Sequence, residues 1–74
     1  MNIDIIGAGW SNGFGIHASL FRIVDGDDIN YRMNLENSFT GKVATRWYDD
    51  RGVAEREMRD ILYDGKMTTD WDWR

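Results

Sequence analysis

The segment Ile5-Ile6-Gly7-Ala8-Gly9 looks like the opening of a dinucleotide-binding fingerprint. In that pattern glycines let the backbone approach a pyrophosphate at a helix N-terminus. The pattern's third glycine falls on Asn12 here, and the segment that follows alternates as a strand does. We therefore expect a glycine-rich loop over residues 7–13 and no cofactor.

A calcium-loop pattern also begins in the sequence and then fails. Asp25, Asp27 and Glu36 occupy its positions 1, 3 and 12. Position 5 is Ile29, and Asn30 stands where the loop requires glycine. These residues fit a hairpin turn better, so we expect a solvated acidic turn and no metal site.

Nucleophilic catalysis would need a base held beside a serine, because the chain has no cysteine. His17 is the one histidine, and Ser11, Ser19 and Ser38 are available to it. No serine lies in a nucleophile elbow, and no pattern places the three groups together. The sequence therefore predicts a protein that is not an enzyme.

Clustered carboxylates at expected turns are the first feature with a functional interpretation. Asp25, Asp27 and Asp28 surround Gly26, and Asp49-Asp50 precedes the expected helix. Turn chemistry and helix capping explain about half of them. The adjacent Asp27 and Asp28 add repulsion that a turn does not require, which favours a role in binding a basic partner.

The second feature is the run Asp70-Trp71-Asp72-Trp73 near the C-terminal end. In an extended chain, residues two apart lie on one side about 6.6 Å from each other. Both carboxylates would then face one way and both indoles the other, as an interface anchor would require. In the alternative interpretation the indoles close a small core and the aspartates keep an edge soluble.

Strands are the elements that must position most of these residues. We expect them over residues 3–6, 14–24, 29–36 and 42–48, from the alternation of apolar and polar side chains. The second half of the 14–24 segment is apolar on both faces, as in a central strand or a bulge. The turn at Asp25-Gly26 joins two of these strands into a hairpin.

A helix is expected over residues 51–64, beginning after Asp49-Asp50 and ending at Asp64-Gly65. Glu55 and Arg59 are expected to pair on its outer side. Residues 66–74 alternate again and are expected to form a late edge strand or an extended arm. The apolar face of the expected helix contains four residues: Ala54, Met58, Ile61 and Leu62.

The predicted fold class is α+β, a small antiparallel sheet of three to five strands with one helix packed on one face. The 74 residues are expected to form a single domain. The net charge of −4 argues against direct binding of nucleic acid or an anionic membrane. Without cysteine or an export signal, a cytoplasmic protein is expected.

In size, charge and expected architecture the chain resembles the small phage-encoded inhibitors of host defence, including the anti-CRISPR proteins. The resemblance covers the whole chain and involves no shared motif, so no residue role is carried over from it. It implies binding to a CRISPR effector complex or a nuclease in the host cytoplasm, with obstruction of target DNA. The chain has nine Lys and Arg residues beside its 13 carboxylates. This mixed charge is equally compatible with a steric block at a mixed-charge interface and with DNA mimicry by charge.

The leading hypothesis is thus a small acidic binding protein that inhibits a nucleic-acid-handling protein by occupying its basic surface. The alternative is an assembly module that forms a homo-oligomer through the sheet face the helix leaves uncovered, with Phe21, Ile23 and Tyr48. The residues expected to bind the basic partner are Asp25, Asp27, Asp28, Asp70, Trp71, Asp72 and Trp73.

Overall fold

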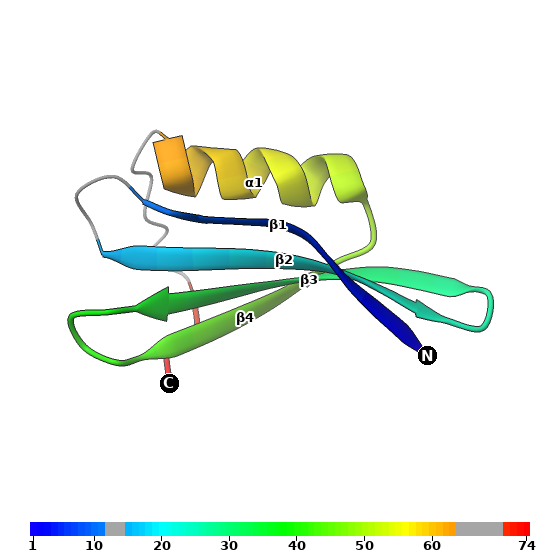
Figure 1. The fold of residues 1–74 in the computed structure, drawn as a ribbon, viewed down its shortest axis with the longest axis horizontal. Coiled ribbons are helices and arrows are strands. Elements are labelled where there is room, and N and C mark those ends of the chain that lie inside the picture. The colour runs from blue at the N-terminus through cyan, green and yellow to red at the C-terminus, as the bar shows by residue number, and fades with distance from the viewer. Residues whose placement is uncertain (12–14, 64–70) are drawn as a thin grey trace.

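Four antiparallel strands and one helix make up the fold, in the order in which they occur along the chain (Figure 1). The computed structural model describes residues 1–11, 15–63 and 71–74. The sheet has the strand order β1-β2-β3-β4, and α1 lies across one of its faces. The predicted α+β class is confirmed. The elements are β1 (Asn2–Trp10), β2 (Ile16–Asp25), β3 (Asp28–Asn37), β4 (Val43–Tyr48) and α1 (Arg51–Tyr63).

The hairpin between β2 and β3 is closed by a two-residue turn. Asp25 pairs with Asp28, which leaves Gly26 and Asp27 as the turn residues. Gly26 has a φ of 63°, and glycine at the first position of a two-residue loop is typical of a type II′ turn. This turn matches the twist of the two strands, so the hairpin predicted from Asp25-Gly26 is confirmed.

The first strand is longer than predicted, because residues 7–10 continue β1 and do not form a loop. Gly7 and Gly9 lie opposite Leu20 and Ala18 on the side that faces α1. A Cβ atom on Gly7 would lie 2.7 Å from Met58 Cε, and one on Gly9 would lie 3.0 Å from a Leu62 methyl carbon. The glycines of the apparent dinucleotide motif therefore allow the helix to approach the strand.

A β-bulge between Ile5 and Gly7 interrupts the pairing of β1 with β2. The extra residue is Ile6, which packs against the core together with Met58 from the helix. A bulge changes which face later residues point to, so Ile5 faces away from the helix while Ile6 and Gly7 both face it.

The helix begins where the two aspartates predicted it. The backbone N–H of Gly52 donates a hydrogen bond of 2.9 Å to Asp50 Oδ1, which identifies Asp50 as the N-cap. Ala54, Ile61 and Leu62 are buried, as predicted. Glu55 forms an ion pair of 2.7 Å with Arg51, in place of the expected pair with Arg59. The predicted helix end at Asp64-Gly65 lies outside the described residues.

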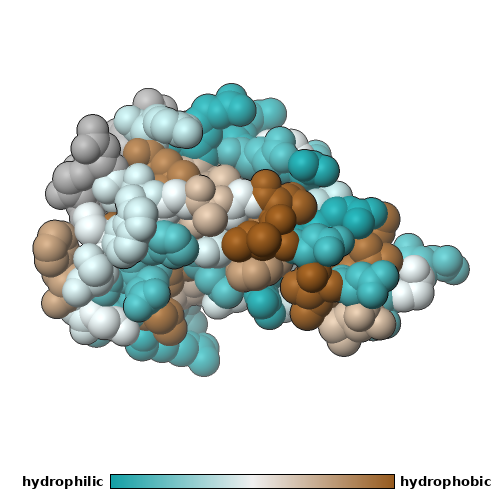
Figure 2. All heavy atoms as spheres, in the orientation of Figure 1, coloured by the Kyte–Doolittle hydropathy of each residue, from teal (hydrophilic) through white to brown (hydrophobic). Residues whose placement is uncertain are grey.

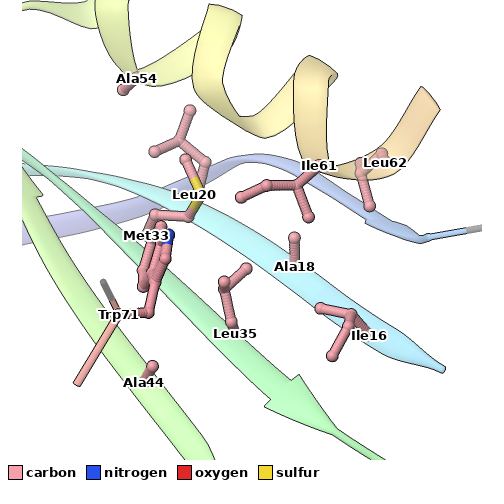
Figure 3. Packing of buried hydrophobic residues seen from close by; sticks show 10 residues of the cluster. All are labelled: Ile16, Ala18, Leu20, Met33, Leu35, Ala44, Ala54, Ile61, Leu62 and Trp71. Atoms are coloured by element: carbon pink, nitrogen blue, oxygen red, sulfur yellow. The ribbon is translucent and has the colours of Figure 1, made fainter. Parts of the chain in front are cut away.

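The core lies between α1 and the sheet face that it covers (Figure 3). Leu20 and Met33 are fully buried at its centre, and each such side chain contributes about 1.5–3 kcal/mol through removal from water. Trp71 lies beside Met33 and Ala44, over the part of the sheet formed by β3 and β4 (Figure 3). The C-terminal segment thereby completes a core that one helix is too narrow to cover.

In the part of the chain that the structure describes, no helix has the length and apolar character needed to cross a membrane.

Candidate protein-binding surfaces

The sheet face opposite α1, here called the open face, carries an unusual share of the exposed apolar side chains. Strand alternation and register place three of them there at about half of their full exposure: Ile3 at 52%, Ile5 at 60% and Trp47 at 56%. Phe21, which is partly buried, and Ile23, which is buried, lie between them on β2. These five residues are called the apolar cluster. Figure 2 shows apolar surface in brown where β1 passes below the helix.

Arg32 lies within the apolar cluster and is held there by two aromatic rings. Its guanidinium carbon is 5.0 Å from the centroid of Phe21 and 5.7 Å from that of Trp47. Contacts of this kind are worth about 0.5–2 kcal/mol and restrict the side chain. Arg32 Nε is buried without a hydrogen-bond partner in the described structure, and no described carboxylate pairs with the guanidinium. The open face thus presents a fixed positive charge surrounded by apolar surface.

The other half of the open face is polar and contains a shallow hollow of about 430 Å³. His17 and Glu36 pair across β2 and β3 at its end, and the His17 ring lies 4.9 Å from the Trp10 ring. Thr45 donates a hydrogen bond of 3.1 Å to Asn34 Oδ1 in the middle of the sheet. The hollow is therefore lined by side chains that can form hydrogen bonds with a partner. Among the described contacts, none of them positions a serine hydroxyl as a nucleophile.

The structure does not assemble the serine–histidine arrangement considered from the sequence. Ser11 is buried, and its Oγ accepts a hydrogen bond from the N–H of Ile16. The Ser38 hydroxyl donates a hydrogen bond to the carbonyl oxygen of Gly15. Ser19 shares the hollow with His17, but both project from the same strand, and no bond joins them among the described contacts.

The three aspartates at the β2–β3 turn, Asp25, Asp27 and Asp28, are all exposed. None forms an ion pair with a described residue. Asp49 lies at the same end of the sheet, because Tyr48 pairs with Tyr31 near the start of β3. We call Asp25, Asp27, Asp28 and Asp49 the acidic end. Asp50, next in the chain, is occupied as the helix cap.

The C-terminal run is built differently from an exposed anchor. Trp71 is only 5% exposed, and the Arg46 guanidinium covers its ring at 4.2 Å. Trp73 is half-buried and packs against the same core. Asp72 is exposed and pairs with Arg74 at 2.9 Å. The structure therefore favours the alternative interpretation, in which the indoles close the core.

The backbone of Arg74 exchanges two hydrogen bonds of 2.8 Å with Val43, at the outer edge of β4. The expected edge strand is thus represented by a single paired residue in the described segment. Asp70 lies outside the described residues.

The acidic end and the C-terminal run do not form one surface. Val43 pairs with Glu36, near the far end of β3 from Asp28. Glu36 lies eight positions along the strand from Asp28, which corresponds to about 26 Å. Figure 1 shows the β2–β3 turn and the C-terminus at opposite ends of the molecule. The same separation keeps Glu36 away from Asp25, and the described residues contain no cluster of three metal-binding side chains.

One residue expected on the open face lies on the other side of the sheet. Tyr48 pairs with Tyr31, and both pack against the core under the helix side. Burial raises the pKa of the Tyr48 phenol above its ordinary value, and the nearby Glu57 carboxylate raises this pKa further. Trp47 takes the position on the open face that was assigned to Tyr48. Neighbouring residues of a strand face opposite sides of the sheet, so the expectation for Tyr48 named the wrong face of β4.

Comparison of this chain with protein-family models, with curated proteins and with solved structures returns no match.

Proposed function

We propose that this chain is a small acidic binding protein that inhibits a nucleic-acid-handling protein by occupying its basic surface. The acidic end is the observation that carries the proposal. Such a partner, for example a CRISPR effector complex or a nuclease, holds phosphates with Lys and Arg side chains. Carboxylates presented on a rigid turn would compete for those side chains.

The aspartates of the β2–β3 turn are available for this role. Gly26 supplies the positive φ on which the turn depends, so the fold does not require a carboxylate at Asp27. Asp25 and Asp28 face each other across the hairpin, where like charges are destabilising. A Lys or Arg side chain of a partner would relieve this repulsion, so relief of the repulsion between Asp25 and Asp28 would add to the binding free energy.

Apolar contact surface adjoins these charges. On β1 the half-exposed Ile3 pairs with Ile23, a buried residue two positions before Asp25 on β2. An interface that combines charge at its rim with apolar side chains at its centre is the common arrangement for proteins that bind proteins. In this proposal Ile3, at the end of the open face next to the acidic end, replaces Trp71 as the anchor, because Trp71 is enclosed in the core.

The test is capture of partners on immobilised protein from nuclease-treated bacterial lysate, with elution by a salt gradient and identification by mass spectrometry. We expect a basic nucleic-acid-binding protein that is released at moderate salt and loses its nucleic acid when this chain is added. Asp27→Lys should reduce its capture at least about tenfold, since the charge reversal places like charges together.

The matched control is Asp72→Lys, which makes the same change at the opposite end and should leave capture unchanged. If Asp72→Lys abolishes capture and Asp27→Lys does not, the acidic end is not the binding surface. If the captured protein still binds nucleic acid in the complex, the inhibitor proposal is wrong.

A further inference from the structure

We infer that the open face is self-complementary and joins two copies of this chain face to face, with Arg32 of each copy against Glu36 of the other. This inference concerns a different surface from the acidic end and does not depend on the identity of any other partner. It commits the part of the open face centred on Asn34 to one occupant, a second copy.

The charges on β3 carry the argument. Arg32 and Glu36 lie on the open face at equal distances on either side of Asn34, about 6.6 Å each way along the strand. Neither forms an ion pair with another described residue. A two-fold axis that crosses the strands at Asn34 and lies between two facing sheets exchanges these positions. Each copy then supplies the opposite charge that the other copy lacks.

The same axis brings together apolar and aromatic side chains on the neighbouring strands. Phe21 pairs with Arg32, and His17 pairs with Glu36, so the axis places Phe21 over His17 of the second copy. On β4 it places Trp47 over Val43 of the second copy, by the same register. The residues at the axis, Ser19, Asn34 and Thr45, are small or polar. They let two sheets approach the spacing of about 10 Å that stacked sheets adopt.

The other two-fold arrangement of the same faces is disfavoured. An axis parallel to the strands that runs along β3 would place Arg32 against Arg32 and Glu36 against Glu36 of the second copy. Like charges that face each other in a closed interface repel, so the charge pattern favours the antiparallel arrangement over this one. A closed two-fold pair of this kind uses one patch on both copies, as most homodimers do.

The available area is sufficient for a dimer at the small end of the known range. Four strands spaced about 4.8 Å apart, over the span from Tyr31 to Asn37 that is symmetric about Asn34, give a flat area of roughly 440 Å² per copy. Side-chain relief raises the accessible area above this value. Two copies would bury on the order of 1,000 Å², near the lower limit for a specific interface.

The test measures the molar mass of the full chain by sedimentation equilibrium over a wide concentration range. The natural chain should reach the mass of a dimer as concentration rises. Arg32→Glu alone and Glu36→Arg alone should each weaken the dimer at least about tenfold, because each creates only like-charged pairs. A mixture of these two variants should form a dimer, and so should the double variant, since both restore opposite charges.

The control is Arg59→Glu, an exposed helix residue with the same charge change, which should dimerise as the natural chain does. Circular dichroism of each variant shows whether it is folded. A natural chain that stays monomeric overturns the inference. Single variants that dimerise normally, or that fail to associate with each other while folded, also overturn it. Asp27→Lys should not alter the dimer, so this result is separable from the fate of the proposed function.

Discussion

Trp71 illustrates how one side chain can serve the fold where its sequence context suggests an interface. It lies between the charged Asp70 and Asp72 in the sequence, yet its ring fills the space over Met33 and is covered by Arg46. Arg46 in turn forms an ion pair of 2.6 Å with Glu57 of the helix. This single indole therefore connects the C-terminal segment, β4 and α1.

We expect Trp71→Ala to lower the free energy of unfolding by about 3–5 kcal/mol, because it leaves a large cavity in the core. For a domain whose total stability is of the order of 5–15 kcal/mol, that loss is severe. Urea denaturation followed by circular dichroism measures it. Trp47→Ala is the matched control, and its exposed ring should cost far less. Equal losses for the two variants would contradict the core role of Trp71.

The sequence did not predict the position of Trp71, because a tryptophan at such a site can either anchor an interface or fill a core. Tryptophan is large enough to anchor an interface and to fill a core, and alternation of Trp with Asp is compatible with both. Only the position of the strand edge and of Arg46 decides between them. The histidine environment was similarly open, because the ring contact with Trp10 depends on a strand that was predicted to end before that residue.

At the level of elements, β3 and α1 were predicted best, because each has an uninterrupted period. β3 alternates without exception, and α1 has a clear cap and a continuous apolar face. β1 was predicted poorly, since two glycines in a short segment are usual in loops. Their use here depends on Met58 and Leu62, which follow some fifty residues later in the sequence. No local pattern contains that information.

The two adjacent aspartates before α1 give an internal comparison for the helix cap. Asp50 bonds the N–H of Gly52, whereas Asp49 makes no hydrogen bond in the described structure. Asp50→Ala should lower the free energy of unfolding by about 1 kcal/mol through loss of the cap. Asp49→Ala should change it by less than half of that amount. Thermal unfolding of the two variants side by side checks the assignment, and a reversed order would refute it.

On the scale of the whole molecule, charge is distributed unevenly along an axis of 38 Å. The composition predicted an acidic domain, but the placement of its charges depends on which turns share an end. The β2–β3 turn and the end of β4 come together only because the four strands form a simple meander. The separation of this end from the C-terminal run depends on the pairing of Arg74 with Val43, which no pattern in the sequence predicts.

Uneven charge should have a measurable effect on stability. Asp28 faces Asp25 across the hairpin, so Asp28→Asn should raise the free energy of unfolding by about 0.5 kcal/mol at low salt. Salt screens exposed charges, so the gain should shrink at 0.5 M NaCl, where the Debye length is about 4–5 Å. Urea denaturation at both salt concentrations measures this change. A gain that is independent of salt would mean that repulsion is not its cause.

The burial of Trp71 also gives the protein a built-in optical reporter. Of the four tryptophans, Trp10 and Trp47 are exposed and Trp73 is half-buried, which leaves Trp71 as the one enclosed indole. Its fluorescence should be shifted to the blue and shielded from soluble quenchers, while the emission of Trp47 responds to whatever covers the sheet. Release of the C-terminal segment and occupation of the open face can therefore be followed separately, without attaching a dye.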